Sequence, residues 1–243
     1  MAFSLTYKPF GERSILINWP KVINISILKD ILSFKENISK NNVKSIVELR
    51  SAYNSLLVIY NVNKIDFNEE IKTLDKIYLS TGNLPKIECR LWKIPVCYDA
   101  CFGIDLEDMS EEKNCTQASI IKRHSAVVYT VYFLGFLPGF LYLGGLDAKL
   151  FTPRKATPRL KVEKGAVAIG GGQTGIYPQE SPGGWNIIGN SPIEFFDTSK
   201  NEPCFAQAGD KIQFYSISLK EYKQIKTLVE AKVFSLESEV FYG

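Results

Sequence analysis

One stretch of the chain, residues 135–192, is so rich in glycine and proline that it cannot be helical. It holds 12 of the 17 glycines and 6 of the 11 prolines in a sequence of 243 residues. Glycine adopts positive φ and lets other groups approach closely, whereas proline fixes φ and removes a hydrogen-bond donor. The stretch therefore predicts a β-rich region with many tight turns. The aromatic residues and arginines between the glycines also favour a surface of fixed loops that binds a ligand or a partner.

Composition narrows the class of protein. Hydrophobic residues make up 45% and charged residues 23%, which is typical of a globular protein, and no apolar run approaches the roughly 20 residues that span a bilayer. The start of the sequence shows no secretory signal pattern. The net charge of +3 is spread along the chain, so we expect no nucleic-acid partner. An odd number of sparse cysteines favours free thiols in a reducing cytoplasm, and a single histidine argues against a metal site.

The first part of the chain, residues 1–93, predicts a small α+β domain. Apolar residues follow the alternating spacing of strands in some segments and the spacing of helices in others. Asp66 is the expected N-cap of the second helix, which should end near Gly82. This order favours a ferredoxin-like layout in which helices pack on one face of an antiparallel sheet. The expected strands are 3–7, 12–18, 43–49, 55–60 and the extended segment 86–94, and the expected helices are 24–38 and 66–82.

The second part, residues 94–243, predicts a mostly-β domain. Many short strands at regular turn spacing indicate a barrel or a sandwich, closed by a C-terminal helix at 219–230. Two short helices are expected first, at 105–109 and 116–122. The expected strands are 127–134, 166–169, 185–189, 193–196, 203–206 and 211–216.

Two arginines stand out as candidate anion ligands. Arg154 and Arg159 each follow a proline, which stiffens the backbone that carries them. A guanidinium held in this way suits bidentate recognition of a carboxylate or phosphate, although a pair of surface salt bridges is the alternative. The glycine run 170–175 lacks the Lys-Ser/Thr of a phosphate loop, but its amides could still form an anion-binding concavity.

Other polar residues were considered for proton transfer, nucleophilic attack and the lining of a pocket. His124 is the only imidazole and hence the first candidate for proton transfer near neutral pH, although a lone histidine is more often a structural hydrogen-bonder. Ser181 does not lie in the motif of a nucleophile elbow, so it is not expected to be a nucleophile. The turn after it is expected to place Trp185 in the lining of a pocket. The carboxylates Asp105, Asp147 and Glu180 are far apart in sequence, and the sequence leaves open whether any two converge.

The motifs of the central stretch resemble the allophanate hydrolase subunit 1 family. The family includes the PxpB-type subunit of the bacterial ATP-dependent 5-oxoprolinase and the KipI-type inhibitor of a sporulation histidine kinase. The resemblance extends upstream through 94–98, Phe102-Gly103 with Asp105, and His124. It rests on five motifs in fixed order: GFLPGF at 135–140, YLGGLD at 142–147, the two Pro-Arg pairs, GQTGIYP at 172–178 and SPGGW at 181–185.

The resemblance implies a fold and a set of partners. We expect an α+β N-terminal domain followed by a mostly-β, cyclophilin-like barrel. We also expect a complex with a subunit 2 type (PxpC-like) protein and a LamB/YcsF-type (PxpA-like) protein that opens the 5-oxoproline lactam to L-glutamate with ATP hydrolysis. No cofactor motif is recognisable in this chain, so ATP would be used by the assembled complex and the chain would be a non-autonomous subunit. As an alternative, a KipI-type protein would dock on a histidine kinase instead.

The resemblance also implies roles for individual residues. His124 is the expected proton carrier of the composite site. Asn190 stands where relatives carry arginine, and Glu163-Lys164 stands where they carry Pro-Ala, so an anion contact at Asn190 is in doubt. Which loop residues contact substrate and which contact only the partner stays open at this stage. The expected substrate-binding residues are Arg154, Arg159, Gln173, Tyr177 and Trp185.

Overall fold

The computed structural model describes residues 3–41, 43, 45–80 and 89–241, which form two compact units. The first unit comprises residues 1–87 and the second residues 88–243. The expected boundary between residues 93 and 94 falls inside a strand, β5 (Cys89–Cys97). This strand pairs with another strand of the second unit from Leu91 to Cys97, and therefore belongs to the second unit as a whole.

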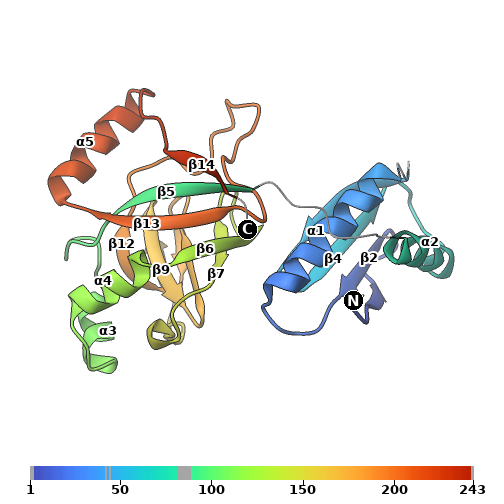
Figure 1. The fold of residues 1–243 in the computed structure, drawn as a ribbon, viewed down its shortest axis with the longest axis horizontal. Coiled ribbons are helices and arrows are strands. Elements are labelled where there is room, and N and C mark those ends of the chain that lie inside the picture. The colour runs from blue at the N-terminus through green and yellow to red at the C-terminus, as the bar shows by residue number, and fades with distance from the viewer. Residues whose placement is uncertain (1–2, 42, 44, 81–88, 242–243) are drawn as a thin grey trace. The chain divides into compact units, whose positions relative to one another are not determined.

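The first unit is a two-layer arrangement of helices on an antiparallel sheet (Figure 1). Its strands lie in the order β1-β2-β4-β3, and the apolar side of the sheet packs against residues of both helices. The predicted N-cap is confirmed, because the Asp66 carboxylate accepts hydrogen bonds from the N–H groups of Asn68 and Glu69. The expected helix end near Gly82, and residues 86–88 of the expected extended segment, lie outside the described residues. The elements are β1 (Thr6–Pro9), β2 (Ser14–Asn18), α1 (Ile25–Lys40), β3 (Ile46–Ser51), β4 (Ser55–Tyr60) and α2 (Phe67–Leu79).

The second unit is a closed barrel (Figure 1), built within the described residues from seven strands in the order β12-β9-β10-β7-β6-β13-β5. The pairing of Asn190 on β12 with Cys97 on β5 closes the ring. Strands β5 and β13 run parallel, and β14 adds antiparallel to one end of β5. The barrel strands are β5, β6 (Val128–Leu134), β7 (Leu141–Gly144), β9 (Ala166–Gly170), β10 (Gln173–Ile176), β12 (Asn186–Asn190) and β13 (Lys211–Ile217).

The remaining elements cover the barrel or extend from it. The expected C-terminal helix is confirmed as α5 (Leu219–Glu230). Strands β8 and β11 form a separate two-stranded ribbon. None of the helices in the described part of the chain has the length and apolar character needed to span a bilayer. These elements are α3 (Leu106–Glu112), α4 (Gln117–Ser125), the short 3₁₀ helix η1 (Ala148–Leu150), β8 (Arg159–Val162), β11 (Ser181–Gly183) and β14 (Ser238–Phe241).

Two expected strands are absent from the described structure of the barrel unit. Residues 193–196 and 203–206 are irregular, although Ile193 and Phe195 are buried in the barrel core. Their alternating apolar pattern therefore reflects burial without a partner strand. Five short strands in the described part of the chain were not predicted, because each has only three or four residues, too few to show an alternating pattern: β7, β8, β10, β11 and β14.

The barrel wall carries apolar side chains on both faces, and this arrangement positions the site. On β9, Val167 and Ile169 point into the core inside the barrel, whereas Ala166 and Ala168 belong to a second apolar cluster. Because side chains alternate along a strand, this second cluster lies on the outer face of the wall. It includes Phe140, Tyr177 and Trp185, which are residues of the glycine-rich stretch.

Candidate functional site

A cleft of about 270 Å³ opens on the outer face of the barrel wall. Its size is close to the lower end of the roughly 300–1,000 Å³ of pockets for drug-sized ligands, which suits a small molecule. Two prolines and two glycines complete the lining: Pro158, Pro182, Gly183 and Gly184. The side chains that give the cleft its character are five aromatic residues and two cations: Phe136, Phe140, Tyr142, Tyr177, Trp185, Arg154 and Lys155.

The aromatic residues of the cleft are packed edge to face, the arrangement that ring quadrupoles favour. Phe140 lies edge-on to Tyr177 at 5.4 Å and to Trp185 at 5.7 Å between ring centroids. Tyr142 contacts Trp185 in the same manner at 6.1 Å. The indole of Trp185 lies against Gly170, where a Cβ atom would come within 2.6 Å of the ring. The wall is thus a closely packed apolar surface that requires a glycine behind it.

Phe136 extends this wall at the rim of the cleft. Its backbone has φ of +66°, which is unfavourable for any residue with a side chain and costs of order 1–3 kcal/mol. The residue is 61% exposed, and its ring stands edge-on to Phe140 at 5.6 Å between centroids. An exposed aromatic side chain on a strained turn at the mouth of a cleft is typical of a contact for a ligand or partner.

Arg154 is the exposed cation of the cleft. Its guanidinium carbon lies 5.6 Å from the centre of the Trp185 ring, within the range of a cation–π contact. No carboxylate in the described part of the chain pairs with this guanidinium. Burial raises the pKa of Tyr142, and the charge of Arg154 opposes part of that rise. Arg154 therefore presents unused donors beside the aromatic wall, as recognition of an anion requires.

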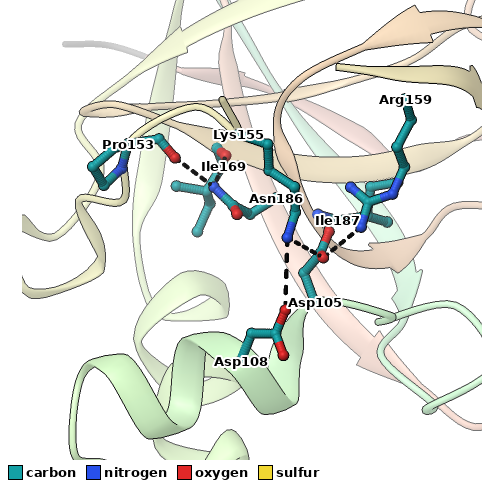
Figure 2. Close-up of polar contacts among 8 residues, drawn as sticks. All are labelled: Asp105, Asp108, Pro153, Lys155, Arg159, Ile169, Asn186 and Ile187. Atoms are coloured by element: carbon teal, nitrogen blue, oxygen red, sulfur yellow. Dashed lines mark hydrogen bonds and ion pairs between the residues drawn. The ribbon is translucent and has the colours of Figure 1, made fainter. Parts of the chain in front are cut away.

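Asp105 is a buried carboxylate beside the cleft, and it pairs with two cations (Figure 2). The side chain is 1% exposed, and its Oδ1 lies 2.7 Å from Lys155 Nζ and 2.6 Å from Arg159 Nη2. Its Oδ2 accepts a hydrogen bond of 2.7 Å from the Ile187 N–H. Lys155 also lies 3.6 Å from the exposed carboxylate of Asp108. One buried carboxylate thus joins the 153–159 loop to strand β12.

The protonation state of Asp105 follows from these contacts. Burial by itself would raise the pKa of the carboxyl group. The hydrogen bonds from Arg159, Lys155 and the Ile187 N–H outweigh this effect and hold the pKa below its ordinary value. Asp105 is therefore ionised at neutral pH.

The loop that carries Arg154 is held at its start and middle by other contacts with β12 and the turn before it. The Asn186 side chain donates hydrogen bonds to the carbonyl groups of Pro153 at 2.9 Å and Ile169 at 3.2 Å (Figure 2). The Lys155 N–H donates to the Gly184 carbonyl at 2.7 Å. Residues 153–158 have no regular secondary structure, so these contacts and the Asp105 ion pairs determine the path of the loop.

His124 lies inside the barrel and away from the cleft lining. It is 0% exposed, and its ring stacks on Phe214 at 4.6 Å. Its Nδ1 contacts the Tyr98 hydroxyl at 2.8 Å and its Nε2 contacts Thr174 Oγ1 at 2.9 Å. Burial lowers the pKa of His124 to about 3. The imidazole is therefore neutral at physiological pH, which does not suit a proton carrier.

The tautomer of His124 follows from its neighbours. Thr174 Oγ1 donates its only hydrogen to the Ala168 carbonyl at 3.0 Å, so it must accept from His124 Nε2. Nδ1 is then the acceptor for the Tyr98 hydroxyl. This chain of hydrogen bonds connects α4, β10 and β9 with the residue that follows β5, and it satisfies both ring nitrogens. It is the arrangement expected of a structural histidine.

The expected substrate-binding residues are only partly brought together. Arg154, Tyr177 and Trp185 line the cleft, whereas Arg159 is turned toward Asp105. Gln173 lies at the start of β10 opposite Gly170, outside the set of described residues that line the cleft. The glycine run 170–175 contains the turn of the β9–β10 hairpin, with Gly171 at φ of +64°.

Three other residues have roles that the sequence missed or left open. Lys155 was missed, although its place directly after Pro153-Arg154 was a usable signal. The convergence of Asp105 on the same loop could not be read from a separation of some 50 residues. Asn190 is buried and bonds to the Tyr222 hydroxyl and to the Lys164 carbonyl, so its side chain links the barrel to α5.

Comparison with known proteins agrees with this architecture. The chain is 37% identical to the B-type subunit of 5-oxoprolinase from Haemophilus influenzae over 206 residues, which cover 85% of this chain and 95% of that protein. It is 31% identical to the B-type subunit of 5-oxoprolinase from Bacillus subtilis over 226 residues, covering 89% of this chain and 94% of the relative. The resemblance seen in the motifs is thereby confirmed.

A solved structure and a family model extend this comparison. The crystal structure of TTHA0988 superposes with a TM-score of 0.73 at 29% identity, over 85% of this chain and 40% of that longer chain. The model of the carboxyltransferase domain, subdomains C and D, matches residues 5–206. The chain therefore belongs to the carboxyltransferase domain family, as a protein of its subdomains C and D.

Proposed function

We propose that this chain is a subunit of a 5-oxoprolinase and that its cleft forms part of the substrate site. The proposal is carried by the similarity to proteins named as B-type subunits of 5-oxoprolinase, which extends over nearly the whole length of those relatives. The reaction is the opening of the 5-oxoproline lactam by water, in which the C–N bond breaks and L-glutamate forms while ATP is hydrolysed.

The chemistry of the cleft suits this substrate. 5-Oxoproline is a small, nearly flat ring that carries one carboxylate. The aromatic wall offers a surface for the ring, and the unpaired guanidinium of Arg154 offers a bidentate partner for the carboxylate. We therefore assign substrate binding to Arg154, Tyr177 and Trp185. Arg159 contributes indirectly through Asp105, and Gln173 and the amides of its hairpin remain candidates for the carbonyl oxygen.

The cleft supports binding better than it supports chemistry by this chain alone. His124 is neutral, buried and fully hydrogen-bonded, so the proton transfers of the reaction are assigned to other groups of the complex. Partner proteins of the subunit 2 type and the LamB/YcsF type would supply those groups and the ATP site. The open cleft, with the exposed Phe136 at its rim, would then face a partner.

The proposal extends to the fold class and the location. We assign the closed barrel to the cyclophilin-like class and the first unit to a ferredoxin-like layout, on the support of their strand orders. All five cysteines are free thiols, which supports the expected cytoplasmic location.

Reconstitution tests the function directly. Co-expression with the two partner types should yield a complex that releases glutamate from 5-oxoproline and ADP from ATP, and omission of this chain should abolish the release. An assembled complex without 5-oxoproline-dependent glutamate release would overturn the proposal. If the isolated chain instead suppressed autophosphorylation of a histidine kinase, the KipI-type alternative would replace it.

Arg154→Ala tests the assigned substrate contact. Loss of a charge-assisted hydrogen-bonded pair costs about 1.5–3 kcal/mol, so KM for 5-oxoproline should rise roughly ten- to hundredfold. Arg154→Lys should recover part of the loss, because it keeps the charge without the planar fork. The matched control is Lys161→Ala, which removes an exposed cation that pairs with Glu180 outside the cleft lining. Equal KM values for Arg154→Ala and the control would exclude the contact.

A further inference from the structure

Strand β12 and the turn before it organise the cleft through three consecutive residues. Trp185 places its indole under the Arg154 guanidinium. Asn186 holds the Pro153 carbonyl, and the Ile187 N–H donates to Asp105. The Asp105 N–H in turn donates to the Ile187 carbonyl at 3.0 Å, so Asp105 is fixed to β12 by both its backbone and its side chain. The carboxylate is therefore anchored on the rigid barrel wall.

Asp105 then transmits this rigidity to the cationic loop. Its Oδ1 binds both Lys155, one residue after Arg154, and Arg159, at the end of the loop (Figure 2). The loop lacks a strand partner between residues 153 and 158. Among the described residues its ion pairs go to Asp105 and, from Lys155 alone, to the exposed Asp108. The position of Arg154 thus depends on a carboxylate that does not itself line the cleft.

The contact with Asp105 fixes the guanidinium of Arg159. Its Nη2 donates a hydrogen bond of 2.6 Å to Asp105 Oδ1, a carboxylate oxygen that is almost fully buried. Two cations also share one buried carboxylate, so removing its charge deprives both of them of this partner.

We propose that Asp105 is a positioning residue of the cleft, which holds Lys155 and Arg159 so that the Arg154 guanidinium stays over Trp185 and faces the substrate carboxylate. Asp105 touches neither substrate nor the aromatic wall in this arrangement. It sets the geometry of the anion contact through the loop. The kinetic consequence of this proposal rests on the proposed function, whereas its structural consequence does not.

The structural consequence is measured on the isolated chain by NMR. Protons of an arginine side chain held over an indole are shifted upfield by the ring current, and Arg154→Ala identifies those signals. In Asp105→Asn, which keeps an acceptor for the Ile187 N–H but removes the charge, the Arg154 signals should move most of the way to random-coil positions. The Arg123 signals should stay, because Arg123 pairs with Asp147 elsewhere. A folded Asp105→Asn variant that keeps the Arg154 ring-current shift would overturn the proposal.

A second variant covers the case in which Asp105→Asn does not fold. Lys155→Met removes one of the two cations and leaves the contacts of Asp105 with Arg159 and Ile187. It should lose part of the Arg154 ring-current shift, and an unchanged shift would equally overturn the proposal. Lys161→Met is the matched control, since it breaks an exposed ion pair with Glu180. It should leave the Arg154 signals unchanged.

The kinetic consequence is measured on the assembled complex. A displaced Arg154 loses part of its charge-assisted contact with the substrate carboxylate, so Asp105→Asn should raise KM for 5-oxoproline roughly tenfold. kcat should fall much less, which distinguishes misplacement of Arg154 from general damage to the fold. A fall in kcat by the same factor as the rise in KM would contradict the positioning role. If the complex assembled with the unmutated chain releases no glutamate, the proposed function is wrong. The role of Asp105 is then decided by the NMR measurement alone.

Discussion

Gly170 is the residue on which the position of Trp185 depends. A Cβ atom at this position would lie 2.6 Å from the indole, far inside van der Waals contact. Gly170→Ala should therefore displace Trp185 and lower the free energy of unfolding by about 1–3 kcal/mol, as overpacking does. Urea denaturation followed by far-UV circular dichroism measures this change.

Gly184→Ala is the matched control for that substitution. The nearest atom to an added Cβ at Gly184 is the Lys155 carbonyl oxygen at 3.5 Å, which is ordinary contact. Its stability should stay within about 0.5 kcal/mol of the parent. If the two variants were equally stable, the close approach at Gly170 would not be what fixes Trp185.

His124 gives the stability a pH dependence with a defined sign. Its folded pKa of about 3 lies below the ordinary value of 6.5, so the unfolded chain binds the extra proton between these limits. Unfolding free energy should fall as the pH drops from 6.5 toward 3, by at most about 1.4 kcal/mol per pH unit from this group. Well above the ordinary pKa the group contributes no slope.

His124→Gln isolates this contribution from that of the carboxylates. The variant should be less stable at pH 7, because the hydrogen bonds to Tyr98 and Thr174 are disturbed. Its unfolding free energy should nevertheless fall less steeply over the roughly two pH units below the ordinary histidine pKa. Parallel stability profiles for parent and variant would show that His124 protonates in the folded state.

For single residues, the sequence indicated some members of the candidate site and could not indicate others. That Arg154, Tyr177 and Trp185 lie together in one cleft agrees with the pattern of proline-stiffened cations and aromatics beside glycines, and their contact with a substrate stays a prediction. The roles of Asp105 and His124 were not predictable, because each is decided by burial and by neighbours distant in sequence. In the sequence, a carboxylate that pairs with two cations cannot be told from an exposed carboxylate. A neutral imidazole inside a barrel likewise cannot be told from an exposed histidine.

At the scale of elements, α5 begins with a capping box. The Ser218 side chain accepts from the Glu221 N–H, and the Glu221 carboxylate accepts from the Ser218 N–H. Ser218→Ala should lower the unfolding free energy by about 1 kcal/mol, because an N–H group of the first turn loses its partner. Thermal denaturation of the purified chain measures this loss. Lys220→Ala, an exposed change in the same turn, should be nearly neutral.

Helices and long strands were predicted better than short strands. The helix at 219–230 was confirmed because its cap and its periodicity agree. The segments 193–196 and 203–206 were wrongly predicted as strands, since an apolar alternation reports burial and does not require a ladder partner. The pairing of β5 with β13 was beyond prediction, because no local pattern encodes a parallel neighbour so distant in the chain.

At the scale of the molecule, each unit has its own hydrophobic core. Compact units with separate cores are able to fold alone. Fragments 1–80 and 89–243 should therefore each give a dispersed NMR spectrum typical of a folded domain. A collapsed spectrum for either fragment would show that its core is insufficient without the other unit.

The parallel pairing of β5 with β13 has a consequence for the synthesis of the protein. Strand β5 ends at Cys97, whereas its neighbours β12, β13 and β14 begin at Asn186, Lys211 and Ser238. At about 5–20 residues per second, β5 leaves the ribosome on the order of ten seconds before β13. Through that interval both of its edges lack their native partners and can pair with another nascent chain. Pro95 and the cations Arg90 and Lys93 are the kinds of residue that discourage such pairing, so this strand carries its own protection against aggregation.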